Sequence, residues 1–126
     1  MASVTAEFYD LPDGRKPAKE FLDSLNIKMK AKMARTIKLL EDNGTVLREP
    51  YSKELRNGIF ELRAKIGSDI SRVLYFFFYR GKAILTNGFI KKTDKTPVSE
   101  IEKAEKYRNE YINRKGNKRC PLLTNI

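Results

Sequence analysis

The sequence predicts one α+β domain: a small antiparallel β-sheet with two N-terminal helices packed on one face, followed by a C-terminal helix. Three observations support this class. Apolar residues recur at helical spacing within 17–43, strand-like segments follow over 59–90, and a helical pattern returns after Pro97. The 126 residues fit a single domain. We assign it to residues 1–115 and treat 116–126 as a basic C-terminal tail.

The first half of the chain contains one short strand and two helices. Residues 3–9 alternate apolar and polar side chains and predict the strand. Pro17 suits the first turn of the first helix. A second helix is expected over 28–43, where three apolar residues recur at spacings of four and three: Met33, Ile37 and Leu40. Residues 45–58 are predicted to be a polar connection of the kind that often carries function.

Three consecutive antiparallel strands are expected next. Residues 59–66 alternate, so that Glu61, Arg63 and Lys65 point away from the apolar side. The segment 70–79 is apolar on both sides and therefore predicts a central strand, broken only by Arg72. The third strand covers 82–90, and strict alternation places Leu85 and Phe89 on one side and Ile84 and Ile90 on the other.

The C-terminal helix is expected to begin at the sequence TPVSE. Thr96 is a suitable N-cap residue and Pro97 suits the first helical position. The helices are expected to share one face of the sheet, which leaves the polar strand residues on the other face.

Composition limits the possible functions. The chain has 26 Lys and Arg against 16 Asp and Glu, a net charge of +10, which favours polyanionic partners, above all nucleic acid. An acidic protein or an anionic membrane surface is the next choice. The absence of His excludes a Ser-His-Asp triad and a His-ligated metal. The single Cys and the lack of a signal pattern or a long apolar segment indicate a cytoplasmic protein without membrane spans.

A cluster of cations is predicted at one end of the sheet. Arg63 and Arg72 can face each other across a hairpin, and Lys91 and Lys92 end the third strand. Such a cluster suits a sugar-phosphate backbone, because guanidinium groups form paired hydrogen bonds to phosphate. Tyr75 is expected to stack on bases if its ring reaches the open face. The alternative is structural: Arg63 pairs with Glu61 and the tyrosine belongs to the core.

Three segments resemble the phage-derived, HigB-like branch of the RelE/ParE toxin superfamily. They are GIFELR, SRVLYFFF and FIKKTDKTPVSEIEKA, which follow KPAKEFLDSL and IKLLEDNG in that order. The resemblance covers residues 3–112. It implies a RelE-like fold and a type II toxin, in most members a ribosome-dependent endoribonuclease (an mRNA interferase) that cleaves translated mRNA and inhibits translation.

The resemblance also implies roles for particular residues. Arg63 and Arg72 match basic positions of the family site and are expected to clamp the charge of the transition state, and Lys92 is the candidate acid or base. Glu61, which stands where some relatives have Lys, could act as base. The expected RNA-binding residues are four: Lys91, Lys95, Lys65 and Tyr75. No metal or cofactor is expected.

The expected partners are mRNA on the ribosome and a HigA-like helix-turn-helix antitoxin, which would neutralise the toxin in a hetero-oligomeric complex. Two alternatives remain open. A ParE-like protein would share the fold but poison DNA gyrase, and a non-catalytic module would bind RNA or protein without cleaving it.

Overall fold

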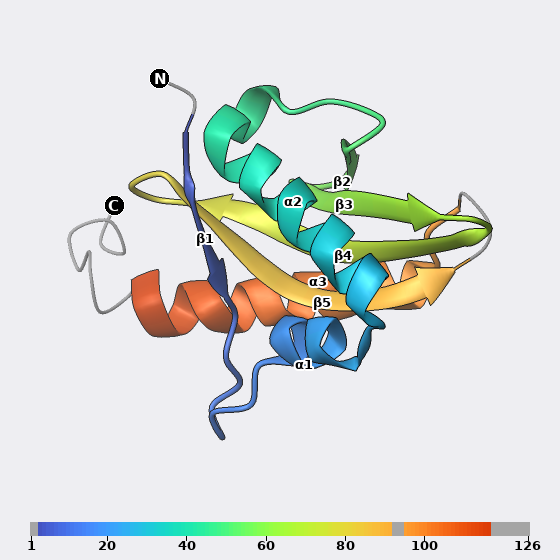
Figure 1. Cartoon of the computed structure of the whole chain (residues 1–126). Coiled ribbons are helices and arrows are strands. Elements are labelled where there is room, and N and C mark those ends of the chain that lie inside the picture. The colour runs from blue at the N-terminus through green and yellow to red at the C-terminus, as the bar shows by residue number, and fades with distance from the viewer. Residues whose placement is uncertain (1–2, 92–94, 117–126) are drawn as a thin grey trace.

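The structure, a computed structural model, describes residues 3–91 and 95–116 (Figure 1). The elements follow in the order β1 (Thr5–Phe8), α1 (Pro17–Ser24), α2 (Ile27–Asn43), a 3-10 turn (Gly44–Val46), β2 (Ser52–Arg56), β3 (Ile59–Ile66), β4 (Asp69–Phe78), β5 (Lys82–Lys91), α3 (Val98–Tyr111) and a π-helical turn (Ile112–Gly116). The predicted α+β class is therefore confirmed, and the arrangement is consistent with a RelE-like fold. The predicted tail lies almost wholly outside the described residues.

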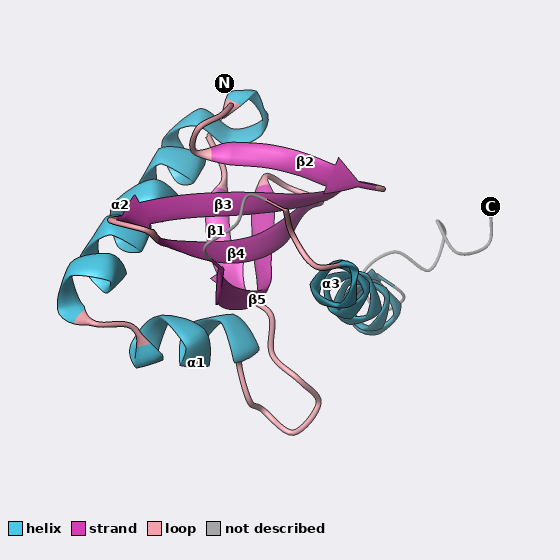
Figure 2. Cartoon of the chain, turned by 90° about the vertical axis from the view of Figure 1, so that its right-hand side faces the viewer, coloured by secondary structure: helices cyan, strands magenta, loops and turns pink. Residues whose placement is uncertain are grey.

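The five strands form one sheet in the order β1-β5-β4-β3-β2. Only the β1–β5 pair is parallel, and the other three pairs are antiparallel. In Figure 2, α1 and α2 cover one face of the sheet and α3 lies against the other. The expectation that all helices share one face is therefore wrong. The polar side chains of β3 do not form an open face, because α3 covers part of it.

β2 is an edge strand that the sequence pattern did not reveal. It lies within the segment that we predicted to be a polar connection, and it pairs antiparallel with β3. Three of its five residues, Lys53, Glu54 and Arg56, are exposed charged side chains. An edge strand needs few apolar contacts and charge protects its open edge, so it shows little hydrophobic periodicity.

The helix boundaries follow local chemistry. Pro17 occupies the start of α1. The side chain of Asn26 accepts a hydrogen bond from the backbone N–H of Met29 at 2.9 Å and so caps α2. Gly44 ends α2 with a φ of 58°, which a side chain would disfavour.

Two apolar clusters lie on the two faces of the sheet. The larger one joins α1 and α2 to the sheet and includes Leu62, Val73 and Tyr75. The smaller one lies beneath α3 and includes Leu74 and Phe76. Successive residues of β4 thus point into different clusters, as expected for a central strand that is apolar on both sides.

Gly88 allows α1 to approach β5 closely. A Cβ atom at this position would lie 2.3 Å from Cδ2 of Phe21, well inside contact distance. The phenyl ring of Phe21 therefore packs directly on the backbone of β5.

We expect Gly88→Ala to lower the free energy of unfolding by about 1–3 kcal/mol, because the added methyl group displaces Phe21. Urea denaturation measures the change. In a Phe21→Ala background the same substitution should cost clearly less, since the clash is removed. An equal cost in both backgrounds would show that Phe21 does not set this limit.

Candidate functional site

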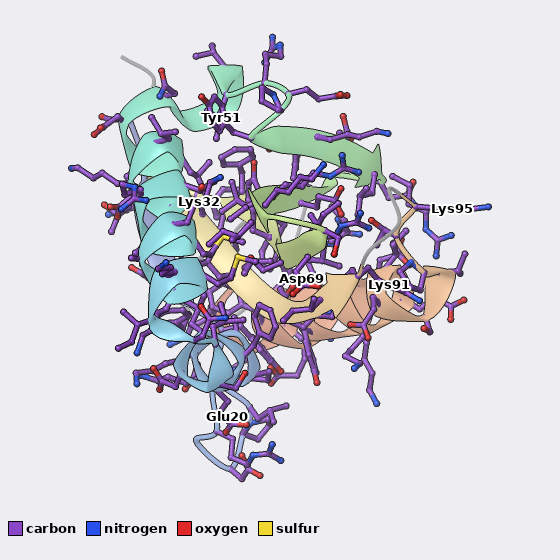
Figure 3. All side chains as sticks on the ribbon, turned by 45° about the vertical axis from the view of Figure 1, so that its right-hand side comes forward. Glu20, Lys32, Tyr51, Asp69, Lys91 and Lys95 are labelled. Carbon is purple, nitrogen blue, oxygen red and sulfur yellow. The ribbon has the colours of Figure 1, made fainter. Side chains whose placement is uncertain are left out.

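The sheet brings cationic residues of three strands to one end. Arg63 of β3 lies directly opposite Arg72 of β4, as the sequence predicted. Lys91 of β5 lies opposite Ile70, at the same end of β4. The strands therefore bring these positions together, although they are far apart along the chain. Figure 3 shows Lys91 and Lys95 on one side of the molecule, where β5 ends and the chain enters α3.

The Glu61 carboxylate organises this end of the sheet. Its Oε2 accepts a hydrogen bond from Nε of Arg63 at 2.6 Å, and its Oε1 accepts one from Oγ1 of Thr96 at 2.5 Å. Glu61 is fully buried, whereas the side chain of Arg63 is 19% exposed. A buried carboxylate is tolerable when its oxygens are paired in this way. In this arrangement Glu61 holds Arg63 in place and is itself shielded from solvent.

Arg72 lies deeper in the same cluster. It is completely buried, its guanidinium lies 6.0 Å from the centre of the Phe89 ring, and one terminal nitrogen donates to Oγ1 of Thr96 at 3.5 Å. The ring face and the hydroxyl both favour the charge. Of the two arginines predicted to clamp phosphate, only Arg63 reaches solvent in this structure.

The predicted RNA-contacting lysines are exposed where they are described. Lys65, Lys91 and Lys95 are all exposed side chains. Lys92, the predicted acid or base, lies outside the described residues, so its role stays a prediction.

Tyr75 does not lie in this site. Its ring is 1% exposed, belongs to the cluster beneath α1 and α2, and stacks on Phe60 with ring centres 5.4 Å apart. Its hydroxyl hydrogen-bonds with that of Ser52 at 2.5 Å. Burial raises the pKa of Tyr75 to about 12. The prediction that Tyr75 stacks on bases is wrong, because the residue points to the face opposite Arg72 and is covered by helices.

Thr96 is a site residue whose position, but not its role, was predicted. It was expected to cap α3, yet Pro97 occupies the N-cap position and makes no side-chain cap. The hydroxyl of Thr96 instead bridges Glu61 and Arg72. The only signal in the sequence is a hydroxyl residue beside Pro97, which equally suits a helix cap.

Other polar networks attach α3 to the sheet and lie outside the candidate site. Glu110 accepts hydrogen bonds from the Tyr9 hydroxyl at 2.7 Å and from Nε of Arg114 at 3.0 Å. The hydrogen bond from Arg114 is the main reason that the pKa of Glu110 is lowered. Arg56 forms a second anchor through paired hydrogen bonds to Glu105. These contacts fix both the middle and the end of α3.

The residues that the structure describes contain no group of three or more Cys, His, Asp or Glu side chains that could together hold a metal ion. None of their helices combines the length and apolar character needed to cross a membrane.

The chain is a small α+β protein whose arrangement is consistent with a RelE-like fold and whose sheet ends in a cluster of cations. Residues 20–109 match the family model described as Phage derived protein Gp49-like (DUF891). The chain belongs to this family, which is associated with toxin–antitoxin systems and is RelE/HigB-like. No curated protein matches the sequence significantly.

We expect Thr96→Val to lower the free energy of unfolding by about 1–3 kcal/mol, because it leaves a buried carboxylate oxygen of Glu61 without its donor. Thr96→Ser, which keeps the hydroxyl, should recover most of this loss. Thr5→Val, at an exposed position of β1, serves as control. Urea midpoints measure all three, and a Thr96→Val protein as stable as the control would contradict the proposed bridge.

We expect Tyr75 to make stability depend on alkaline pH. The folded pKa is about 12 against an ordinary value of 10, so the stabilisation is complete below pH 10 and is lost as pH rises towards 12. Tyr75→Phe should therefore flatten the decline of the urea midpoint above pH 10, whereas Tyr79→Phe, at an exposed ring, should not. If Tyr79→Phe flattened this decline more than Tyr75→Phe, the alkaline loss of stability would not come from Tyr75.

Proposed function

We propose that the protein is the toxin of a type II toxin–antitoxin pair and acts as a HigB-like, ribosome-dependent endoribonuclease on translated mRNA. Membership in the Gp49-like family supports the toxin class. The observation that carries the nuclease proposal is the partly exposed side chain of Arg63, which is held by the buried Glu61. Lys65 and Lys91 are exposed at the same end of the sheet.

Cleavage would proceed by attack of the ribose 2′-oxygen on the adjacent phosphorus. The O2′–P bond forms, the P–O5′ bond breaks, the 2′-hydroxyl loses a proton and the 5′-oxygen gains one. The negative charge on the phosphate oxygens grows during attack. Arg63 suits this charge, because its orientation is set before the substrate arrives and little reorganisation is needed. The buried Arg72 would add positive charge to the site without touching the RNA. Through Thr96, to which it donates a hydrogen bond, it would also help to position Glu61.

Proton transfer needs groups other than the arginines. The pKa of arginine exceeds 12, so the guanidinium is a poor acid or base at neutral pH. Both oxygens of Glu61 already accept hydrogen bonds, so we assign it to positioning rather than to the role of base. Lys92 remains the proposed acid or base. Such a site would depend on the ribosome to hold the RNA in line for attack.

The proposed neutralising partner is a HigA-like helix-turn-helix antitoxin. An antitoxin segment with acidic side chains that covers Arg63 and the exposed lysines would block access of RNA. The net charge of +10 would favour rapid association with such a partner.

We expect Arg63→Gln to reduce mRNA cleavage on the order of 100-fold, as removal of one donor to a developing oxyanion does. Lys92→Ala should also strongly reduce it. Primer extension on mRNA after induced expression measures cleavage, and soluble yield and urea midpoints confirm folding. Arg15→Gln, which removes an exposed arginine of a surface ion pair, is the matched control.

The same experiment separates the alternatives. Codon-phased cuts that disappear in Arg63→Gln support the nuclease. Growth arrest with intact mRNA and a DNA-damage response would indicate a gyrase poison. RNA binding without cleavage in the wild-type protein would indicate a non-catalytic module, and either of these results would overturn the proposal.

A further inference from the structure

A basic groove runs along α2 and continues onto the edge of β3. Two adjoining hollows, with volumes of about 240 Å³ and 440 Å³, form this α2 groove and share Lys32, Thr36 and Tyr51. The smaller hollow is also lined by Pro50, Arg63, Lys65 and Ile70. The larger hollow is also lined by Arg35, Lys38 and Leu39.

The groove exists because β2 is shorter than β3. The pairing of the two strands begins at Ser52 and Leu62, and beyond this point the N–H of Arg63 donates to the carbonyl of Tyr51. Among the described strands, none lies beside the last residues of β3 on this edge. The space between this edge and α2 is therefore lined by side chains of α2 and of the last residues of β3.

Positive charge lines both walls of the groove. Five cations contribute to its lining, and no described Asp or Glu side chain does. Nζ of Lys32 donates to the carbonyl oxygen of Lys65 at 2.5 Å, which holds one ammonium group at the mouth. Lys32, Arg35 and Lys38 follow every three residues, so they rise by about 4.5 Å per step along α2. Lys38 is partly neutralised by Asp42 at 3.3 Å.

An aromatic ring lies between these cations. Tyr51 is 45% exposed and lines both hollows, beside Pro50. Figure 3 shows Tyr51 and Lys32 on the α2 side of the sheet, away from Lys91 and Lys95. A flat, half-exposed ring flanked by cations is the arrangement that binds an unstacked base and its neighbouring phosphates.

We propose that the α2 groove binds single-stranded RNA, with one base on Tyr51 and the adjacent phosphates on Lys32, Arg35 and Lys65. The inference rests on the proposed function and extends it, because Arg63 both lines the groove and is held by the Glu61 carboxylate of the candidate site. One RNA strand can thus pass from the candidate site around the edge of β3 onto α2. An acidic peptide would match the charge as well, and the experiment below distinguishes it from RNA.

Binding of a 12-nucleotide 2′-O-methyl RNA that contains 2-aminopurine tests the proposal on the full chain, since this RNA cannot be cut. Lys32→Gln combined with Arg35→Gln should weaken binding at least 10-fold and reduce the salt slope of log K by about 1.4, because each of these two residues is proposed to contact a phosphate. Lys16→Gln combined with Lys106→Gln removes two exposed cations outside α2 and should leave the slope nearly unchanged.

Tyr51→Leu should weaken binding about 5- to 150-fold without changing the salt slope, and should abolish quenching of 2-aminopurine. Tyr51→Phe keeps the ring and should retain both properties.

Groove variants that bind this RNA as tightly as the Lys16/Lys106 control would overturn the proposal. So would groove variants that lose binding to polyglutamate while they retain RNA, because the groove would then be a protein-docking site. This experiment measures binding and not cleavage. The proposal of RNA binding in the α2 groove can therefore be refuted while the proposed nuclease activity is supported, and the reverse result is equally possible.

Discussion

The buried carboxylate of Glu61 is the group on which the arrangement of the site depends. Without partners, a fully buried carboxylate would cost several kcal/mol. Here Arg63 and Thr96 satisfy one oxygen each, and Thr96 also contacts the buried Arg72. One acid therefore joins β3, β4 and the chain that enters α3. The position of the partly exposed Arg63 side chain follows from this requirement, since another position would break its ion pair with the buried acid.

Much of the site could be predicted because hairpin register follows from turn length. Two residues, Gly67 and Ser68, separate β3 from β4, and this places Arg63 opposite Arg72. Tyr75 shows where this reasoning stops. Alternation puts residues 72 and 75 on opposite faces, but β4 is apolar on both sides, so its sequence does not say which face the helices cover. Which face Tyr75 occupies is decided only by how the three helices pack on the two faces of the sheet.

Two features of the fold left no usable pattern in the sequence. Leu74 pairs with Asn87 while Tyr75 pairs with Leu85, so Thr86 is an extra residue that forms a β-bulge. The bulge reverses the facing of every later residue in β5, and it brings Phe89 onto Arg72. No glycine or proline stands at the bulge. β2 escaped notice for a different reason, since an edge strand is stabilised by backbone hydrogen bonds that any charged sequence can make.

The ion pairs are distributed unevenly, so the excess positive charge is concentrated on one part of the surface. On α1 and α3, described carboxylates lie against cations, as in Glu20 with Arg15 and Glu105 with Arg56. Lys32, Lys65 and Lys91 have no carboxylate within 4.0 Å among the described residues. The unneutralised charge at the cationic end of the sheet therefore continues around the β3 edge to α2. At physiological salt the Debye length is about 8 Å, so charges this close together still act jointly on a polyanion. A strand of RNA held at Arg63 would meet further cations on its path across α2, and the candidate site and the α2 groove would then be two parts of one binding surface.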